Sequence, residues 1–449
     1  MLPIAAAILL AAHAAPPAPR AAADGKAVPQ AAQPALDLRF DATALADLGR
    51  GEALPACFAP IAGDGLVLVR TGFVGSALHM SFECAGPRRP GGAAGEASLL
   101  LSEGRLTGFV VAPDGTRFEL RALDRGAARA TPADTALELP CATDHTHRPP
   151  AREGAVAGAA ACDDGSVVDV FVVYTAAAVA QAGGATAIAD SIAWAVGDSN
   201  AIYAASGVPM TLRLVGTRLA DGYVEDSASM ANDLYALRDP ADAKLDAEHA
   251  AGAAAGADLI ALVRANGGGA CGVAFLVGGS PADVDYGVSV TALGCFSNRT
   301  FTHELGHNMG CCHAPGDGGG CTSGGVLPYG TGHRFVATDG AEYRTVMAYQ
   351  PGTRIGRLSS PIVSYQGTPT GIAGERDNAR SIRELKANIA NFRCSVCEGD
   401  LDGNRTVDAA DLGTLLAAWG TPAADLNGDA TTDAADLSVM LGNWGACGD

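Results

Sequence analysis

Three histidines and one glutamate lie in the stretch FTHELGHNMGCCH, which runs from Phe301 to His313. On a helix, residues four apart lie on one face, one turn above the other, so His303 and His307 can offer two imidazoles to a single ion. This is the spacing at which two histidines bind zinc, and Glu304 then lies beside the ion, where it can take a proton from bound water. The spacing predicts catalytic zinc chemistry with Glu304 as the general base.

A third ligand must come from beyond the helix, because a continuing helix does not return another residue to the same ion. Gly310 tolerates a positive φ and can end the helix, after which the chain turns and His313 returns as the third ligand. Three histidines leave one position open for water, which is typical of a catalytic site with one Zn²⁺. The alternative is a helix whose histidines lie in the core or on the surface, and the complete HExxHxxGxxH pattern favours the metal over it.

The neighbours of this motif have alternatives of their own. Asn298 or Thr300 can cap the helix. Cys311 and Cys312 could supply a zinc-binding thiolate or, in an oxidising compartment, form disulfides, for instance with Cys321.

The motif needs a scaffold, and the segment from Asp163 onward predicts an α/β layer with a largely parallel sheet. A strand at SVVDVFVVYT is followed by helical spacing over residues 185–205 and by a second strand at VPMTLRLVG. Short apolar strands follow at ADLIALV, GVAFLVGG and YGVSVTAL, and NARSIRELKANIANFR predicts a later amphipathic helix. We expect the strand at residues 286–293 to form the sheet edge, where it could pair with an extended substrate.

HELGHNMGCCH followed by YRTVMAY resembles the metzincin zinc endopeptidases. The segment that begins at Leu358 and ends at Arg393 is similar to the C-terminal end of reprolysin-like bacterial metalloproteases, including the peptidyl-Asp metalloendopeptidase type. The resemblance implies an α/β (α+β) catalytic domain over residues 161–397, with a twisted, mostly parallel sheet and an active-site helix. It also implies that the domain hydrolyses peptide bonds in proteins or peptides.

Two further residues take roles from this resemblance. Met347 would be the methionine of the Met-turn, which runs beneath the zinc-binding histidines in that family. Tyr349 resembles the astacin and serralysin pattern, where this tyrosine lies at or near the zinc and can stabilise the oxyanion; the alternative is a packed aromatic. Reprolysins carry Asp directly after the third histidine, whereas this chain has Ala314 and then Pro315.

The N-terminal third of the chain resembles a secretory signal followed by a propeptide. Residues 1–14 combine a short apolar run with an A-x-A sequence, which is typical of a secretory signal, although an Ala-rich leader is the alternative. The twelve cysteines agree with a secreted, extracellular protein, free or attached to the cell surface. Secreted enzymes of the family that the chain resembles are usually made as zymogens, and residues 15–160 lie where a leader and a β-rich propeptide would, so the resemblance implies a zymogen. Cys141 could block the zinc as a thiolate, or it could pair within the even set completed by Cys57, Cys84 and Cys162.

The last 52 residues, 398–449, hold ten acidic residues and one arginine and repeat with a period of 25. DLDGNRTVDAADL begins at Asp400, and DLNGDATTDAADL begins at Asp425. Each copy offers oxygen atoms at the loop positions by which EF-hands bind calcium, including a backbone carbonyl at position 7. The predicted ligands are Asp400, Asp402, Asn404, Thr406, Asp408 and Asp411 for one ion, and Asp425, Asn427, Asp429, Thr431, Asp433 and Asp436 for a second.

This repeat pair resembles a type I dockerin, a small all-α calcium-binding module, and the resemblance implies a cohesin-type partner. A plain calcium-stabilised module and a solvated acidic tail are the alternatives. Two details depart from EF-hands, since position 12 is Asp and the glycine stands at position 4 rather than 6. Cys397 and Cys447 flank the repeats and could clasp their ends.

Composition sets the remaining limits. A chain of 449 residues predicts two to four folded units, and its net charge of −19 argues against nucleic acid as a partner. Beyond the N-terminus no segment is long and apolar enough to span a membrane. The sequence therefore predicts a secreted zinc endopeptidase zymogen with a calcium-binding C-terminal module. The alternatives are a calcium-dependent scaffold or adhesion protein with a non-catalytic metzincin-like domain, and a zinc hydrolase that is not a peptidase.

Overall fold

The computed structural model describes residues 35–62, 66–84, 95–112, 115–133, 162–278, 280–318, 324–402, 404, 406–427 and 429–447. The predicted signal segment, Cys141 and Cys321 lie outside the described residues. Within the described part, no helix has both the length and the apolar character needed to cross a membrane.

The N-terminal sheet consists of seven antiparallel strands in the order β1-β7-β6-β5-β4-β3-β2. The alternating pattern seen in the sequence buries Leu66 and Leu68 at the start of β2, whereas the later part of this strand is half-buried or exposed. Leu45 and Phe58, on short helical turns, pack on one face of the sheet. The elements are β1 (Leu36–Arg39), α1 (Ala42–Ala46), η1 (Ala56–Phe58), α2 (Ala59–Ala62), β2 (Leu66–Val74), β3 (Ala77–Cys84), β4 (Glu96–Ser102), β5 (Arg105–Val111), β6 (Arg117–Asp124) and β7 (Ala127–Pro132).

The central sheet has five strands in the order β11-β12-β10-β8-β9, and only β11 runs antiparallel to its neighbour. The expected mostly parallel sheet is therefore present. The expected edge is wrong, because β12 is hydrogen-bonded on both sides and β11 forms the edge. The strands are β8 (Val167–Thr175), β9 (Thr211–Ala220), β10 (Leu259–Arg264), β11 (Gly272–Ala274) and β12 (Val288–Ala292).

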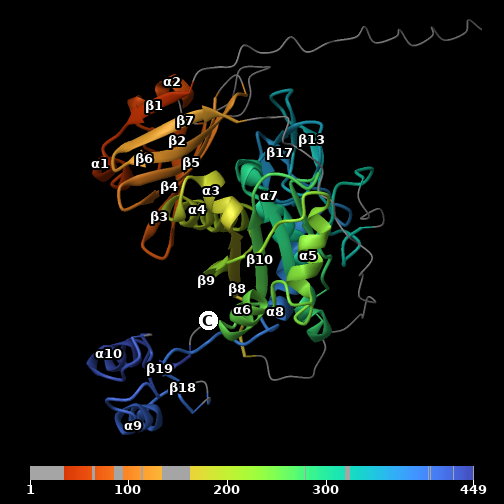
Figure 1. Ribbon diagram of the computed structural model, residues 1–449. Helices are drawn as coiled ribbons and strands as arrows, with labels where there is room; N and C mark the ends of the chain where they lie inside the picture. Colours follow the sequence, from red (N-terminus) through yellow and green to blue (C-terminus); the bar gives the residue numbers. More distant parts are fainter. Residues whose placement is uncertain are drawn as a thin grey trace, which may run out of the picture. The chain divides into compact units, whose positions relative to one another are not determined.

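Helix α4 (Ala185–Ala205) lies between the two sheets (Figure 1). Every residue from Trp194 to Ser199 is buried, so this stretch of the helix faces protein on all sides. Trp194 packs edge-on against Phe109 of β5, so both sheets share one hydrophobic core through this helix. The other helices of this region are α3 (Ala176–Ala182), α5 (Met230–Arg238), α6 (Asp246–Ala254), η3 (Pro281–Tyr286), η4 (Leu293–Asn298), α7 (Thr300–Asn308) and α8 (Asn378–Ile389).

A long, mostly irregular segment joins α7 to α8 and carries only short strands. These are β13 (Arg334–Val336), β14 (Glu342–Arg344), β15 (Thr353–Arg354), β16 (Ser364–Tyr365) and β17 (Thr368–Pro369). A disulfide joins Cys162 to Cys394 and ties together the two ends of this α/β part. The proposed pairing of Cys162 within the N-terminal set is therefore wrong, and Cys57 and Cys84 are free thiols. A second disulfide joins Cys271 to Cys295.

The C-terminal repeats fold as two loop–helix units. Each helix begins with an Asp that caps it and an Asp three residues later that returns the bond, a capping box that fixes the loop against the helix. The predicted clasp is present as a disulfide between Cys397 and Cys447. The elements are β18 (Thr406–Val407), α9 (Ala409–Ala417), α10 (Ala434–Gly442) and β19 (Gly445–Ala446).

Candidate active site

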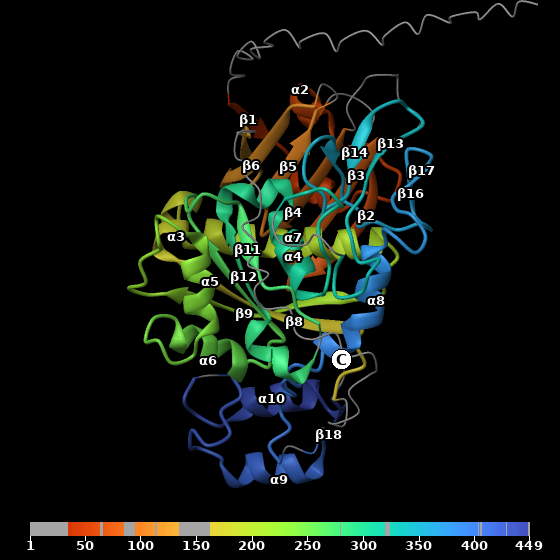
Figure 2. The ribbon, with the colours of Figure 1, turned by 90° about the vertical axis from the view of Figure 1, so that its right-hand side faces the viewer.

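Helix α7 carries the histidine motif beside strands β11 and β12 (Figure 2). All nine of its residues are buried, so its polar side chains face protein rather than solvent. The expected cap is wrong, because the N-cap is Arg299, which adopts a left-handed conformation with φ 62°. The carbonyl of Arg299 accepts the first helical bond, from the amide of His303.

The three predicted ligands converge. The Nε2 atom of His303 lies 3.2 Å from those of His307 and His313, and the latter two lie 3.0 Å apart. Gly310 makes this possible, because its φ of 79° ends the helix and turns the chain back toward His313. Three nitrogens bound tetrahedrally to one zinc at the usual bond length would be about 3.3 Å apart. The histidine geometry fits a zinc ion.

The opposite ring nitrogens explain why a cation belongs there. The Nδ1 atoms of the three histidines lie 2.9, 2.8 and 3.2 Å from the carbonyl oxygens of Val346, Cys311 and Gly318. A carbonyl accepts only from a protonated nitrogen, so each Nε2 is the unprotonated atom. Three lone pairs then face one another, which is unfavourable without a positive ion between them.

Electrostatics keep His303 in the neutral form. Burial lowers the pKa of His303 well below its ordinary value, and His313 and Arg354 lower it further. A neutral imidazole is the form that binds a metal.

Glu304 follows His303 on the helix and is fully buried. It packs against the edge strand at Gly272, where a Cβ atom would lie only 2.3 Å from Oε1 of Glu304. Any larger residue at this position of β11 would displace the carboxylate. The geometry therefore explains a glycine that the sequence pattern did not single out.

The turn around Met347 passes directly beneath α7. A Cβ atom added at Gly306 would lie 2.6 Å from Sδ of Met347, so the glycine of the motif allows this close approach. Arg344 and Arg354 both donate to the carbonyl of Ala348, the residue that follows Met347, and hold the turn in place.

Tyr349 reaches the histidine cluster, a position that fits both the expected role at the metal and the alternative of a packed aromatic. Its hydroxyl lies 3.0 Å from Nε2 of His313, and its ring centroid lies 4.2 Å from that of His313. A phenol at this position can donate a hydrogen bond to an oxygen atom that develops negative charge beside the metal.

Asp317 is a residue that the sequence analysis missed. Its Oδ2 accepts from the amides of Ala314 and Tyr349, at 3.1 and 2.9 Å, and its Oδ1 is paired with Arg334. It thereby ties the loop that follows His313 to the Met347 turn. The sequence offered one signal for it. Ala314 stands where reprolysins carry Asp, and the next acidic residue along the chain is Asp317, three positions later.

The neighbouring cysteines are not ligands in this arrangement. Cys311 is a buried free thiol, and burial raises its pKa. Cys312 is disulfide-bonded, as the second of the two alternatives expected.

The predicted calcium ligands come together in part. Carboxylate oxygens of Asp400, Asp402 and Asp411 lie within 4.8 Å of one another. The carboxylate of Asp411 accepts the amides of Leu401, Asp402 and Asp408. The corresponding Asp436 accepts those of Leu426, Asn427 and Asp433 in the second loop.

The other predicted calcium ligands shape the loops themselves. The amide of Asn404 donates to the side chains of Asp400 and Asp402, and that of Asp429 donates to those of Asp425 and Asn427. Thr406 pairs with Ala446 in the β18–β19 ladder, whereas the amide of Thr431 donates to Asp429. Both loops are thus closed by their own acidic side chains.

Comparison with known proteins places this site in context. The family model described as metallo-peptidase family M12 matches residues 164–359. The chain is 30% identical over 307 residues to a peptidyl-Asp metalloendopeptidase of Stenotrophomonas maltophilia (strain R551-3), covering 67% of this chain and 71% of the relative. A relative of the same name from Xanthomonas campestris pv. campestris is 32% identical over 232 residues, covering 51% of this chain and 52% of the relative.

Among solved structures, metalloproteinase-II from Bacteroides fragilis is similar over 71% of this chain and 86% of its own. The TM-score is 0.37 and the identity is 10%, values too low to bear on function.

Proposed function

The chain belongs to the M12 metallopeptidases and is a metalloendopeptidase, and on this premise we propose that it is a secreted zinc enzyme in which Glu304 is the general base. The observation that carries the assignment of the site is the convergence of the three Nε2 atoms of His303, His307 and His313. A set of three histidines leaves a position for water and substrate, as a catalytic rather than a structural site requires.

Each residue of the site has a distinct task in this proposal. Zinc held by the three histidines would supply Lewis acidity that polarises the scissile carbonyl and acidifies a water molecule. Glu304 takes the proton of the attacking water and passes it to the leaving amine nitrogen. The hydroxyl of Tyr349 donates to the carbonyl oxygen as it becomes an oxyanion. Asp317 accepts hydrogen bonds from the amides of Ala314 and Tyr349 and so fixes Tyr349 relative to the loop after His313.

Strand β11 is the element that would receive the substrate. As the antiparallel edge of the central sheet, it is paired with β12 on one side only, and an extended peptide can add to the other side through main-chain hydrogen bonds. Because Glu304 lies against Gly272 of the same strand, a peptide bound there would pass the general base.

The substrate class follows from the names of the relatives and from charge. We propose cleavage next to Asp, as the name peptidyl-Asp metalloendopeptidase indicates for the relatives. Two buried arginines, Arg344 and Arg354, lie beside the Met347 turn and lower the pKa of His303. A positive field of this kind favours an acidic side chain next to the scissile bond.

The remaining expectations stay part of the proposal. They are a zymogen with residues 15–160 as leader and propeptide, two calcium ions in the C-terminal repeats, and a cohesin-type partner for those repeats. Closure of both loops by acidic side chains supports the calcium sites. Cys141, the candidate zymogen switch, lies outside the described residues.

The decisive experiment compares the wild type with Glu304→Ala in zinc content and in cleavage of a mixed protein substrate. We expect both to bind one zinc and the variant to lose about 10²- to 10⁴-fold in kcat, the usual contribution of a positioned acid or base. The termini of the product peptides should lie next to Asp. Zinc-loaded wild-type protein that cleaves nothing even after the propeptide has been removed would support the scaffold alternative instead.

A further inference from the structure

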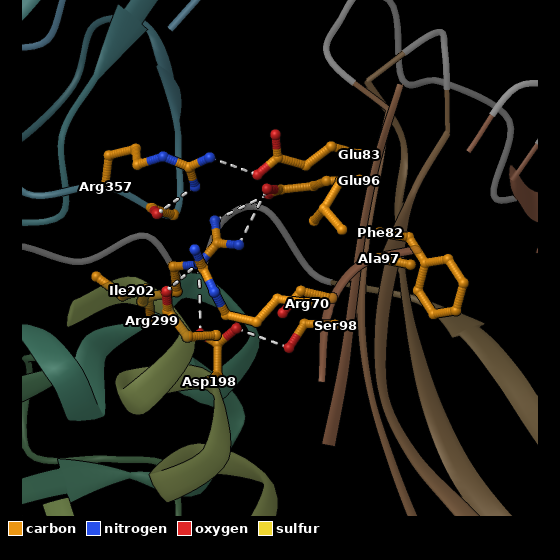
Figure 3. Close-up of a pocket in the computed structure, with 14 residues that line it drawn as sticks. Arg70, Phe82, Glu83, Glu96, Ala97, Ser98, Asp198, Ile202, Arg299 and Arg357 are labelled. Atoms are coloured by element: carbon orange, nitrogen blue, oxygen red, sulfur yellow. Dashed lines mark hydrogen bonds and ion pairs between the residues drawn. The ribbon is translucent and has the colours of Figure 1, made fainter. Parts of the chain in front are cut away.

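Arg299, the residue before the zinc-motif helix, is buried in a polar pocket between the N-terminal sheet and α4 (Figure 3). Its guanidinium forms two hydrogen bonds with the carboxylate of Glu96 on β4, at 2.8 and 3.0 Å. Its Nε lies 3.3 Å from Asp198 on α4. The Arg299 side chain is only 5% exposed and lies over the ring of Phe109. One arginine therefore joins the start of α7 to both neighbouring elements.

The backbone of Arg299 makes this anchor relevant to the histidines. Arg299 has a φ of 62°, a left-handed conformation that is unfavourable for a residue with a side chain and persists only when its surroundings hold it. Its carbonyl accepts from the amide of His303, the first ligand of the triad. A shift of the Arg299 side chain would therefore move the first turn of the helix.

The N-terminal sheet holds the same region at three other points. Ser297 donates to Glu119 of β6 at 2.8 Å, and Arg117 of β6 lies 3.5 Å from the side chain of Asn298. Glu83 of β3 accepts from Arg357 at 2.6 Å. The carbonyl of Arg357 in turn accepts from the amide of Val346, whose own carbonyl lies against Nδ1 of His303. Contacts from the N-terminal sheet thus reach His303 from both sides.

We propose that Arg299 is a positioning residue, and that Glu96 of the N-terminal sheet aligns the zinc-motif helix through it. In the full chain, the N-terminal sheet then helps to hold the zinc-binding histidines in position. This goes beyond a propeptide that merely covers the active-site cleft, and it rests on the proposed zinc site at His303, His307 and His313. Removing Glu96 leaves a buried arginine with half of its charge partners, which loosens the turn that starts α7.

The test uses the full chain and measures two quantities. In Glu96→Gln we expect the zinc dissociation constant, measured by competition with a chelator, to rise about 10-fold, the scale of outer-shell effects on metal sites. Backbone amides of residues 300–308 should exchange hydrogen faster in the zinc-free form.

The matched control is Asp190→Asn. Arg105 of β5 binds Asp190 of α4 in the same two-bond manner, at 2.8 and 3.1 Å, but this pair does not touch α7. We expect a lower melting temperature and an unchanged zinc dissociation constant. Equal losses of zinc affinity in both variants, or none in Glu96→Gln, would overturn the proposal.

A second variant guards against failure of Glu96→Gln to fold. Glu83 is 30% exposed, so Glu83→Gln removes the negative charge that pairs with Arg357 without creating a cavity in the core. It should raise the zinc dissociation constant in the same direction by a smaller factor, and an unchanged constant would contradict the proposal. Zinc affinity and hydrogen exchange require no substrate, so these results stand even if the proposed Asp-directed cleavage fails.

Discussion

At the scale of single residues, the site depends on groups that orient other groups. Each ligand histidine has its Nδ1 against a main-chain carbonyl, so the protonated side of every ring is set by the backbone. Asp317 accepts from the amide of Tyr349 and thereby places the phenol hydroxyl 3.0 Å from Nε2 of His313. Tyr349 is thus held at the metal position before any substrate binds.

Tyr349→Phe tests the task assigned to that hydroxyl. The ring should keep its contacts with His303 and His313, so zinc content should not change. Loss of one donor to the oxyanion should lower kcat by about 100-fold with little effect on KM. Steady-state kinetics on a fluorogenic peptide would measure this, and full activity in the variant would reduce Tyr349 to a packing residue.

At the scale of elements, α4 is the layer on which both sheets depend. Gly197 allows the ring of His79 from β3 to approach within 2.8 Å of the position of a Cβ atom. His79 is bound to Ser98, and Ser98 donates to Asp198 of α4. Burial lowers the pKa of His79 to about 4, against a weaker opposing effect of Asp198 and a further lowering by Arg299.

This histidine should make the sheet–helix interface sensitive to acid. In the unfolded chain the pKa of a histidine is about 6.5, so the unfolded state binds more protons than the folded state as the pH falls from 6.5 toward 4. The contribution of the neutral His79 to the free energy of unfolding is therefore fully present above pH 6.5 and is lost as the pH falls from 6.5 toward 4. From pH 7 to 4.5, His79 should contribute about 2 kcal/mol to the fall in the free energy of unfolding.

His79→Gln isolates this contribution. Urea unfolding at the two pH values, followed by the fluorescence of the buried Trp194, should show a smaller fall in the variant than in the wild type. Carboxylates elsewhere titrate in both proteins and cancel in the comparison. Parallel pH curves for the two proteins would show that His79 does not carry the effect.

At the scale of the whole molecule, the acidic C-terminal repeats stand apart in chemistry from the zinc site. Their two loops place oxygen atoms at equivalent positions 25 residues apart. The disulfide between Cys397 and Cys447 closes a loop of 50 residues around both of them. A cross-link of this span restricts the unfolded chain, so the repeats are held together without metal, and the proposed calcium ions would bind to a preformed arrangement.

Calcium titration by calorimetry tests this module. We expect two calcium ions per chain in the wild type and one in Asp402→Ala, because the second loop does not involve Asp402. Affinities of extracellular calcium modules lie near 10⁻⁴ to 10⁻³ M, so the titration should extend to about 10 mM, with magnesium as the control ion. The zinc content should be the same in both proteins. Absence of a calcium-specific heat would leave the repeats as a folded acidic module without the proposed ions.

Local features could be predicted from the sequence because bonded geometry determines them. The spacing of His303, Glu304 and His307 sets their directions on a helix, Gly310 sets the turn, and the 25-residue repeat sets two equivalent loops. The parallel character of the central sheet followed in the same way from the alternation of strands and helices.

Other features were decided only by the tertiary structure. These are the hydrogen bonds by which Asp317 ties the loop after His313 to the Met347 turn, the disulfide of Cys162 with Cys394, β11 as the edge strand, and the ion pair of Glu96 with Arg299. Each joins segments that lie far apart in the chain or adjusts a loop of irregular conformation. Such contacts depend on how whole elements pack around α4 and α7, and residue spacing along the chain does not determine them.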